Sequence, residues 1–494
     1  MKPVLTANQM RETEKRFFSM GELSLDLMEK AARELTRDIW DIMPEGGKTC
    51  VFACGAGGNG GDGYAAARMF AQAGGRAVIL KLGEPTNPDA LVNSEKAAKK
   101  VFAVIGMDTL DTLPRPDVWV DCILGIGLSR PVEGDIERLI ARMNADRTLG
   151  SKTISCDIPS GLNADSGEIM GICVNADVTT ALSTYKRGHF LGNGPDVCGK
   201  VIPHDLGIPA SCLPEAYMEL IEDSDVTLPE RPRTAHKNTF GHLLVFAGSR
   251  GMAGAAVMTA KAALRTGAGL VTVACPESIT DIIQISVPCA LCLPLPEVGG
   301  AVSDEAVDLL TEALKGKTAI AMGPGLSRKA SIRCVELLLT SGLPAVIDAD
   351  ALNIISEHEE LKELLTDKHA LTPHPGEAKR LTGADADAVT QAMTLSALGC
   401  AALVKGASSV ISGKKLRMST SGCVGMAKGG SGDVLTGMTG ALLAQGMSPE
   451  AALMAASQLH GRAGEKAAEI FGEVSMLPTD LIEMIGQVIL HENA

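Results

Sequence analysis

Apolar residues recur at helical spacing near the start of the chain. Between Ala7 and Met43 this pattern predicts two helices, and Ser24 is a candidate N-cap for the second. After Met43 the pattern changes to short apolar runs, each followed by Gly, Pro or Asp, which alternate with helix-like stretches. Strands that alternate with helices indicate a mainly parallel sheet with helices on both faces.

Two such series follow one another along the chain. The first ends near residue 215, and the second begins at GHLLVFAGS, residues 241–249. Residues 209–234 between them are rich in Pro and acidic residues and are expected to link two domains. A chain of 494 residues is long enough for two or more domains. Because no internal repeat is evident, we expect two different α/β domains, residues 1–215 and 225–494.

Composition narrows the range of partners and locations. The net charge of −14 and the absence of a basic stripe argue against a nucleic-acid partner. No run approaches the roughly 18 apolar residues of a membrane span, and no secretory signal is visible. The 13 Cys residues are scattered, and the CxxC of Cys289 and Cys292 has no second pair. Buried structural thiols are the favoured interpretation, with metal or redox work as the alternative, and free thiols fit the cytoplasm.

A Gly-rich stretch follows the first apolar run. Residues 54–63 read CGAGGNGGDG, in which Gly55, Gly57 and Gly60 satisfy GxGxxG. Such a turn lets backbone N–H groups approach a pyrophosphate at a helix start. The dinucleotide fingerprint also requires an acid about 20 residues further on, where the next strand offers Lys81 and then only Glu84. An ordinary NAD-dependent dehydrogenase therefore fits poorly.

Polar residues follow three of the expected strands of the first domain. Asn59 lies in the Gly-rich turn, Asp121 begins DCILGIGLSRP, and Ser160 lies in CDIPSG. Ligands of an open α/β sheet bind beyond the carboxyl ends of its strands, where these oxygens could converge on a hard cation. Alternatively, the acids merely cap loops or helices.

The motifs GNGGDG, DCILGIGLSRP and CDIPSG, in this order, resemble the epimerase domain of the NAD(P)H-hydrate repair enzymes over most of residues 1–215. The resemblance implies a Rossmann-like domain that acts on NADH or NADPH hydrated at C6 of the nicotinamide. These hydrates are called NADHX and NADPHX. It implies K⁺ bound by Asn59, Asp121 and Ser160, and makes Lys81 and Asp121 candidates for proton transfer. The implied substrate-binding residues are Gly58, Asn59, Gly60, Gly61, Asp62, Gly125, Ile126, Gly127, Leu128, Ser129, Arg130, Pro131 and Asp157.

A second Gly-rich turn lies in the C-terminal half. Residues 425–437 read GMAKGGSGDVLTG, and a helix is expected to follow the turn. Successive N–H groups at a helix start form an anion hole, beside which Asp433 could take a proton from a reacting hydroxyl. The alternative is a Gly-rich turn with an N-capping Asp. Further motifs follow strand-like runs: GPG at 323–325, DADALN at 348–353, TPHPGE at 372–377 and VKGASS at 404–409.

These motifs together resemble the ribokinase-like, ADP- or ATP-dependent NAD(P)H-hydrate dehydratases over about residues 225–490. The resemblance implies use of Mg²⁺ with the nucleotide. The hydrate would contact Ala255, Gly325, His374 and Asp433, although His374, between two prolines, could be purely structural. The nucleotide would contact Lys405, Gly406, Ala407, Ser408, Ser409 and Gly432.

Two positions depart from the dehydratase pattern. Met252 and Ala253 stand where the family commonly has a Tyr, and Lys428 stands where it commonly has a Thr. Neither change removes a backbone donor or Asp433, and Lys428 could strengthen the attraction for phosphate.

The sequence therefore predicts a bifunctional, cytoplasmic and homo-oligomeric repair enzyme for NADHX and NADPHX, with ADP or ATP as co-substrate. A vitamin-precursor kinase with an accessory N-terminal domain shares the GSGD turn, but it does not explain GNGGDG together with CDIPSG. A nucleotide-sensing regulator would bind without turnover, which the intact Asp433 argues against. Neither the choice between ADP and ATP nor that between NADHX and NADPHX can be read from the sequence.

Overall fold

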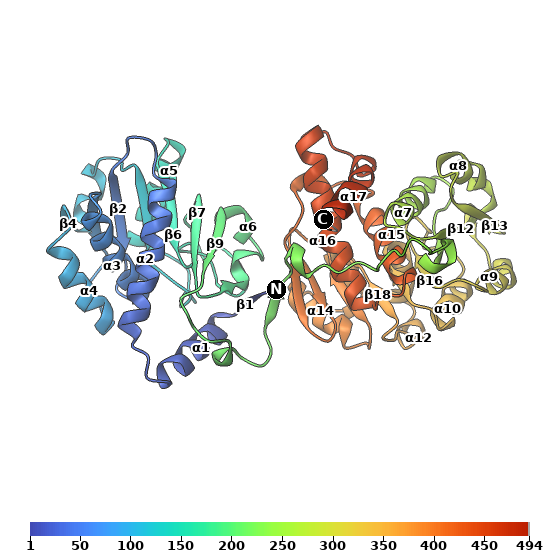
Figure 1. The fold of residues 1–494 in the computed structure, drawn as a ribbon, viewed down its shortest axis with the longest axis horizontal. Helices are drawn as coiled ribbons and strands as arrows, with labels where there is room; N and C mark the ends of the chain where they lie inside the picture. Colours follow the sequence, from blue (N-terminus) through green and yellow to red (C-terminus); the bar gives the residue numbers. More distant parts are fainter. Residues whose placement is uncertain (493–494) are drawn as a thin grey trace. The chain divides into compact units, whose positions relative to one another are not determined.

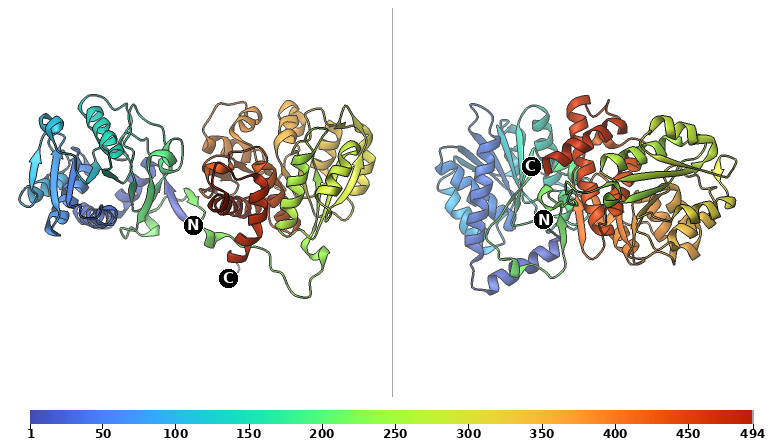
Figure 2. Two further views of the ribbon diagram at one scale, coloured as in Figure 1. Left: turned by 90° about the horizontal axis from the view of Figure 1, so that it is seen from above. Right: turned by 45° about the vertical axis from the view of Figure 1, so that its right-hand side comes forward.

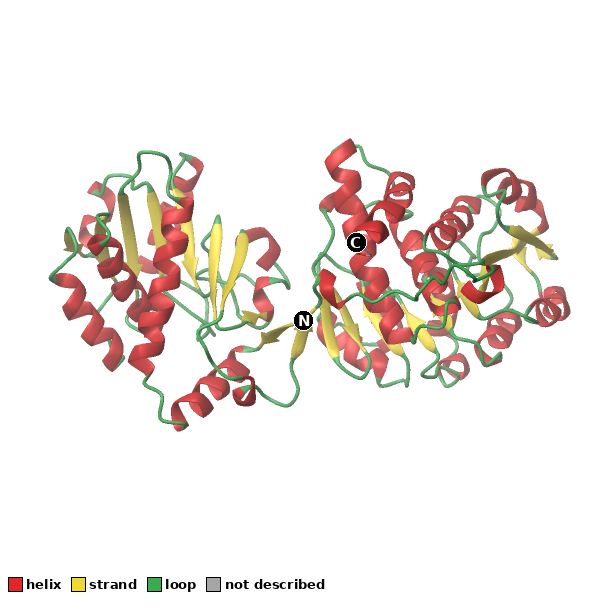
Figure 3. Ribbon diagram, viewed as in Figure 1, coloured by secondary structure: helices red, strands yellow, loops and turns green. Residues whose placement is uncertain are grey.

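The computed structural model describes residues 1–492, which form two compact units (Figure 1). One unit spans Lys2–Tyr217, and the other starts at Met218 and includes Met1. In each unit helices cover both faces of a mainly parallel sheet (Figure 2, Figure 3). The predicted fold class, a Rossmann-like α/β domain followed by a ribokinase-like α/β domain, is confirmed as two α/β units with parallel sheets.

The sheet of the N-terminal unit has the order β4-β3-β2-β5-β6-β7-β9, and all its pairs are parallel. Outside this sheet, β1 (Lys2–Leu5) pairs in parallel with β8 (Tyr185–Lys186). The strands of the sheet are β2 (Thr49–Cys54), β3 (Arg76–Lys81), β4 (Ala103–Ile105), β5 (Val118–Cys122), β6 (Lys152–Cys156), β7 (Val178–Leu182) and β9 (Lys200–His204). The helices are α1 (Ala7–Ser19), α2 (Ser24–Ile42), α3 (Gly58–Gln72), α4 (Pro88–Ala98), α5 (Asp135–Thr148) and α6 (Gly194–Val197).

Strand β2 shows why this sheet needs helices on both faces. Cys50, Phe52 and Cys54 pack into one apolar cluster with α2 and α3, whereas Val51 and Ala53 pack into another with α5. A strand buried on both faces reads as a continuous apolar run, which is the pattern that the sequence shows.

The two helices predicted between Ala7 and Met43 are present as α1 and α2. The predicted N-cap of α2 is wrong by one residue, because Leu23 occupies the cap and Ser24 is the first helical residue. The Ser24 hydroxyl donates instead to Oδ2 of Asp89 at 2.6 Å, a partner 65 residues away that local pattern cannot reveal.

The sheet of the C-terminal unit runs β13-β12-β11-β16-β17-β18-β19-β20-β21-β10. It is parallel from β13 to β19, β20 is antiparallel to both its neighbours, and β10 is parallel to β21. The strands are β10 (Met218–Leu220), β11 (His242–Phe246), β12 (Leu270–Pro276), β13 (Leu291–Leu295), β16 (Ala319–Met322), β17 (Ala345–Ile347), β18 (His369–Leu371), β19 (Ala401–Val404), β20 (Ser409–Ser412) and β21 (Leu416–Ser419). A small hairpin joins β14 (Glu297–Val298) to β15 (Ala301–Val302).

The helices of this unit include three that pack with α15 over one face of the sheet, namely α7, α16 and α17. The full set is α7 (Ala253–Arg265), α8 (Thr280–Ser286), α9 (Val307–Ala313), α10 (Ile332–Thr340), α11 (Ala349–Glu357), α12 (Glu359–Lys362), α13 (Pro375–Thr382), α14 (Ala388–Ser396), α15 (Ser431–Ala444), α16 (Pro449–Phe471) and α17 (Pro478–Glu492). Nearly every residue of α15 is buried, so this helix forms the centre of the layer.

The stretch predicted as a link, residues 209–234, is only partly irregular. It contains β10, whose Met218 and Leu220 are buried and which pairs with β21. The division between the units therefore falls between Tyr217 and Met218, inside this stretch.

Most of the thiols are buried, in agreement with the favoured interpretation of the cysteines. The CxxC is the exception, because Cys289 is exposed and Cys292 is half-buried, with its Sγ 3.8 Å from Sγ of Cys275. Among residues 1–492, no helix combines the length and the apolar character needed to cross a membrane.

Candidate active sites

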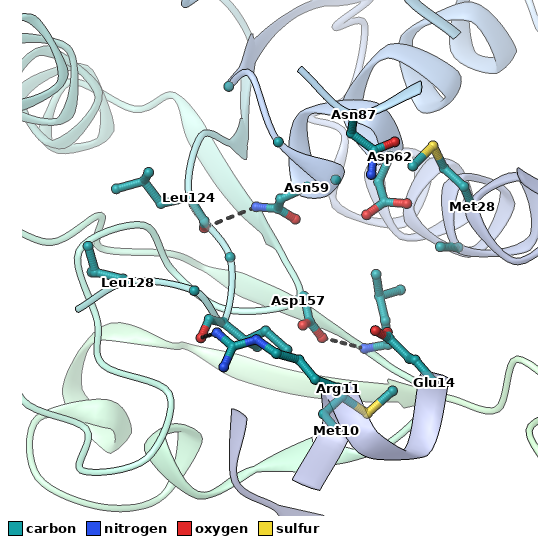
Figure 4. A pocket seen from close by; sticks show the side chains of 18 of the residues that line it. Met10, Arg11, Glu14, Met28, Asn59, Asp62, Asn87, Leu124, Leu128 and Asp157 are labelled. Atoms are coloured by element: carbon teal, nitrogen blue, oxygen red, sulfur yellow. Dashed lines mark hydrogen bonds between the residues drawn. The ribbon is translucent and has the colours of Figure 1, made fainter. Parts of the chain in front are cut away.

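A cavity of about 730 Å³ opens in the N-terminal unit beyond the carboxyl ends of β2, β5 and β6. The Gly-rich turn, the loop after β5 and the loop after β6 contribute to its lining, and α1 and α2 contribute further side chains (Figure 4). The predicted substrate-binding residues that line it are Gly58, Asn59, Asp62, Gly125, Ile126, Gly127, Leu128, Ser129, Arg130 and Asp157. The structure thus brings together three motifs that are separated in sequence.

Two glycines of the first motif have a packing role instead. A Cβ on Gly60 would lie 1.9 Å from the carbonyl oxygen of Gly55, and a Cβ on Gly61 would lie 2.6 Å from Cε of Met28. Neither residue lines the cavity. Both let α3 start close to the loop and to α2, so that its N-terminus, with Gly57 as N-cap, lies at the cavity. The positive end of the helix dipole there favours an anionic group such as a pyrophosphate.

The predicted cation ligands gather around one backbone carbonyl, that of Leu124. Nδ2 of Asn59 donates to it at 3.0 Å, and Oγ of Ser160 lies 3.2 Å from it. The Ser160 hydroxyl also donates to Oδ1 of Asp121 at 2.5 Å. The side chain of Asn59 and these oxygens form a donor set that suits a hard monovalent cation and lacks the sulfur or imidazole of a zinc site. The residues present therefore fit K⁺.

Asp121 lies below the cavity floor and is fully buried. Burial raises the pKa of its carboxyl group, while hydrogen bonds from Ser160 and Ser155 act in the opposite direction. With its oxygens engaged in this way, Asp121 is placed as a structural residue rather than as a group that meets substrate.

Lys81 and Pro131 also lie outside the cavity lining. Lys81 ends β3, and its Nζ forms an ion pair with Glu84 at 2.6 Å. The structure thus does not bring the predicted proton-transfer residues Lys81 and Asp121 to the cavity surface.

Asp157 has an unusual backbone conformation and a partner that the motifs did not reveal. Its φ of 64° lies in the left-handed region, which a non-glycine residue adopts only where its surroundings enforce it. Its carboxylate forms an ion pair with Nζ of Lys186 and accepts the backbone N–H of Leu182 at 3.0 Å. The Lys186 ammonium is 1% exposed and also donates to the carbonyls of Leu182 and Thr184. These contacts fix the carboxylate at the cavity wall.

Helix α1 supplies two charged lining residues, Arg11 and Glu14, that sequence analysis missed. Burial raises the pKa of Glu14, and burial together with the charges of Asp157 and Glu14 raises the pKa of Asp62 well above its usual value. No motif surrounds Arg11 or Glu14, so only the packing of α1 against the unit could have identified them.

In the C-terminal unit, the first turns of α7 and α15 meet. Oγ1 of Thr259 donates to the carbonyl of Asp433 at 3.1 Å and to that of Ala255 at 2.9 Å. A Cβ on Gly437 would lie 2.2 Å from the carbonyl oxygen of Thr259, so this glycine allows the two helices to approach. A Cβ on Gly325 would lie 2.9 Å from Cβ of Ala255. Three predicted hydrate contacts, Ala255, Gly325 and Asp433, therefore lie around one point.

A charged network lies next to Asp433. Nζ of Lys405 pairs with Oδ1 of Asp348 at 2.7 Å, and Oγ1 of Thr436 donates to Oδ2 of Asp348 at 2.7 Å. Burial and the negative charges of Asp348 and Asp350 together raise the pKa of Asp433 to about 7, against the opposing charge of Lys405. A carboxylate with a pKa near neutrality is suited to general-base catalysis. Asp348 begins the DADALN motif, but its role was not predicted.

Two of the predicted nucleotide residues, Lys405 and Gly432, adjoin the same helix start. A Cβ on Gly432 would lie 3.3 Å from Nζ of Lys405, so only a glycine leaves this space beside the ammonium open. Gly430, the N-cap of α15, has a φ of 110° that favours glycine. The cation and the free N–H groups of the helix start fit the phosphates of a nucleotide.

His374 occupies the N-cap of α13. Its Nδ1 accepts the backbone N–H of Gly376 at 3.0 Å, while Nε2 lies 3.5 Å from Oε1 of Glu377. The capping bond fits the structural alternative for this histidine, although the ring is 52% exposed and free to meet a ligand. Burial raises the pKa of Glu377, and the charge of Asp348 raises it further.

The expectation that Lys428 attracts phosphate is wrong in this structure. Its Nζ donates to the carbonyls of Val474, at 2.8 Å, and Met476. The side chain therefore ties the Gly-rich loop to residues 474–476 and does not point its charge into the anion hole. The sequence could not reveal these partners, which lie more than 40 residues away.

The two units together define a two-site α/β enzyme with a Gly-rich helix start at each site. The model of the NAD(P)H-hydrate dehydratases matches residues 243–487, and that of the YjeF-related protein N-terminus matches residues 24–188. The bifunctional NAD(P)H-hydrate repair enzyme Nnr of Salinibacter ruber is 34% identical over 98% of this chain and 96% of its own length. That of Coxiella burnetii is 34% identical over 96% of both chains. The chain belongs to the family of bifunctional NAD(P)H-hydrate repair enzymes.

A solved structure is similar to the C-terminal unit. The ADP/ATP-dependent NAD(P)H-hydrate dehydratase of Bacillus subtilis, co-crystallised with ATP and Mg²⁺, is 27% identical. The match covers 56% of this chain and 99% of that chain, with a TM-score of 0.47.

Proposed function

We propose that the N-terminal cavity interconverts the R and S epimers of NADHX and NADPHX, and that the C-terminal site dehydrates the S form at the expense of ADP or ATP. The observation that carries the proposal is the position of Asp433. Its carboxylate stands in the first turn of α15 with a pKa raised to about 7, beside the ammonium of Lys405 and the space at Gly432. The names of the full-length relatives support the same pair of activities.

Dehydration needs a better leaving group than hydroxide. Asp433 takes the proton of the C6 hydroxyl, whose oxygen attacks the terminal phosphorus of the nucleotide. The bridging P–O bond breaks, AMP leaves from ADP (or ADP from ATP), and the C6 oxygen becomes a phosphate ester. The C6–O bond then breaks with its electron pair on the phosphate, and the lone pair of N1 forms a double bond to C6. A proton then leaves C5, and the electrons of the C5–H bond form a double bond between C5 and C6. The electron pair of the N1–C6 double bond returns to N1, which restores the dihydronicotinamide.

We assign nucleotide binding to Lys405, Gly406, Ala407, Ser408, Ser409 and Gly432. Lys405 offsets the charge of the phosphates, and the N–H groups at the start of α15 donate to the phosphate oxygens. Mg²⁺, carried in with ADP or ATP, would neutralise part of the phosphate charge. Ala255, Gly325 and His374 would position the hydrate beside Asp433.

We assign K⁺ to Asn59, Asp121 and Ser160 in the epimerase unit. The ion would hold the turn at Leu124 and the loop after β5 in place at the cavity. We assign substrate binding to those residues of the three motifs that line the cavity. Gly60, Gly61 and Pro131 do not line it and support the lining residues. The homo-oligomeric state and the cytoplasmic location stay predictions.

The proposal is tested by incubating purified protein with NADHX or NADPHX and either ADP or ATP, while the absorbance of the regenerated dihydronicotinamide is followed. We expect NADH or NADPH to form only with nucleotide, and both epimers to be consumed. A kinase acting on a vitamin precursor would consume nucleotide without regenerating either product. A regulator would bind nucleotide without turnover, and either result would refute the proposal.

A further inference from the structure

The N-terminal cavity contains two acidic side chains that the motifs do not explain. Glu14 comes from α1 and Asp62 from α3, and both side chains point into the cavity from different walls (Figure 4). Within residues 1–492, neither carboxyl group takes part in a hydrogen bond or an ion pair. Met10 lies near Glu14 and Met28 near Asp62, so apolar surface borders both groups.

The other acids of the lining are already engaged. Asp157 is held by Lys186 and the N–H of Leu182, and Asp89 accepts the hydroxyl of Ser24. Lys186 is buried and saturated by three oxygen acceptors. The remaining cations of the lining, Arg11 and Arg130, do not release protons near neutral pH. Glu14 and Asp62 are therefore the titratable groups with a free face toward a ligand.

We propose that Glu14 and Asp62 are the acid and base of epimerisation, acting from the two sides of the hydrated nicotinamide ring. This inference rests on the proposed epimerase function. When the hydroxyl leaves C6 from one face and water adds to the other face, a proton donor is needed on one side and an acceptor on the other. Two carboxyl groups on different walls meet that requirement.

Each step balances without any further reactant. The protonated carboxyl group donates to the C6 hydroxyl, the C6–O bond breaks with its pair on oxygen, and water leaves as the lone pair of N1 forms a double bond to C6. Water then attacks C6 from the other face, the pair of the double bond returns to N1, and the ionised carboxylate takes the proton of the water. The reverse reaction exchanges the two roles.

The surroundings of the pair favour one shared proton. Burial raises the pKa of both groups, the negative charge of Asp157 raises both further, and the charge of Glu14 adds to the rise for Asp62. Lys186 lowers the pKa of both, and Arg11 lowers that of Glu14. Like charges at one site separate two titrations, so one group stays protonated while the other ionises.

The test uses Glu14→Gln and Asp62→Asn in the full-length protein, with Glu12→Gln as the matched control. Glu12 lies on the same helix, is exposed, and accepts the side chain of Asn8 at 3.0 Å. R-to-S conversion is followed by chromatographic separation of the epimers between pH 5 and pH 9. We expect kcat to fall about 100-fold or more in each variant. The bell-shaped pH profile of the parent should lose one limb, while KM changes little.

A second measurement follows the oxygen. In water enriched in ¹⁸O, one label should enter the C6 hydroxyl for each conversion, because the C6–O bond breaks. Absence of label, or variants that keep the parent rate, would overturn the proposal. So would variants that lose rate with an unchanged bell-shaped profile, since that is the result of a packing defect. If the parent protein itself does not interconvert the epimers, the proposed function fails instead, and this outcome is recognised before any variant is made.

Discussion

Among single residues, Asp433 offers the most direct test, because its carboxyl group is the proposed base of dehydration. Asp433→Asn keeps the size of the side chain and its place in the first turn of α15, but it removes the base. We expect dehydration of S-NADHX to fall by about 100-fold or more, as when general-base catalysis is lost. Nucleotide binding should persist, because the backbone donors and Lys405 remain. Rate and affinity are measured by NADH absorbance and by titration calorimetry, and near-normal turnover would contradict the mechanism.

The pKa of Asp433 predicts a pH dependence. Burial, together with the charge of Asp348, raises this pKa to about 7. A base acts only when ionised, so dehydration should rise with pH through about 7 and level off above it. Asp348→Asn removes one negative neighbour and leaves Lys405 without its carboxylate. Both changes favour the ionised form of Asp433, so the acidic limb should move to lower pH.

The control for this shift is Glu312→Gln, an exposed position on α9 whose side chain pairs with Lys315. It removes the same charge from the unit without facing Asp433. An acidic limb that stays in place in Asp348→Asn, or one that moves equally in Glu312→Gln, would show that Asp348 does not set the pKa.

The residues that sequence analysis identified at the sites are those that follow strands. The carboxyl ends of parallel strands share one edge of a sheet, so Asn59 and Asp157 could be predicted from motif position alone, whereas Asp433 was predicted from the Gly-rich start of a helix. The residues that support them could not. Lys186 reaches Asp157 across 29 positions and Lys405 reaches Asp348 across 57. Such pairs follow from tertiary packing, which leaves no local pattern.

At the scale of elements, each helix that follows a Gly-rich turn lies very close to a neighbouring backbone segment, and glycine is what permits this approach. Gly60→Ala would place its Cβ 1.9 Å from the carbonyl oxygen of Gly55, which no rotamer can relieve. We expect a loss of about 1–3 kcal/mol from the free energy of unfolding of the N-terminal unit. This loss lowers Tm by roughly 2–12 °C for a unit of this size. Calorimetry should show the shift in one transition only.

Gly57→Ala is the matched control, because a Cβ there meets nothing within 4 Å and the φ of −89° suits alanine. It alters only the preference of the N-cap position, which costs less than a clash with the backbone. Equal destabilisation by the two substitutions would show that the approach of α3 to the loop is not what Gly60 provides.

The proposed cation site joins the starts of three loops, and Asn59→Ala tests it more cleanly than a change at Asp121. Asp121 is buried and accepts from Ser155 and Ser160, so its removal would leave those donors unpaired and weaken the unit. We expect K⁺ to stimulate R-to-S conversion in the parent protein and to have little effect on Asn59→Ala, measured at constant ionic strength. A variant that converts normally with and without K⁺ would show that Asn59 is only a turn residue.

For the whole molecule, the alternation of strands and helices correctly predicted two α/β units, because burial on both faces leaves a continuous apolar signature in each strand. The end of the linking stretch was harder to place. β10 is three residues long and pairs with β21, almost 200 residues further along the chain. A strand this short has no periodicity of its own, and its partner is decided by tertiary structure.

Modularity is the prediction that follows for the whole chain. Each unit has its own sheet and core, and the dehydratase residues all lie after Met218, so a fragment of residues 218–494 should fold and dehydrate S-NADHX while leaving the R form untouched. A shorter fragment, residues 228–494, lacks β10 and also Asp223, which accepts from Gln458 at 2.6 Å and from Arg462 at 2.8 Å. It should show a similar kcat but a lower Tm, because an edge strand and a polar anchor of α16 are gone. If the longer fragment is insoluble or inactive with nucleotide present, the two units depend on one another for folding.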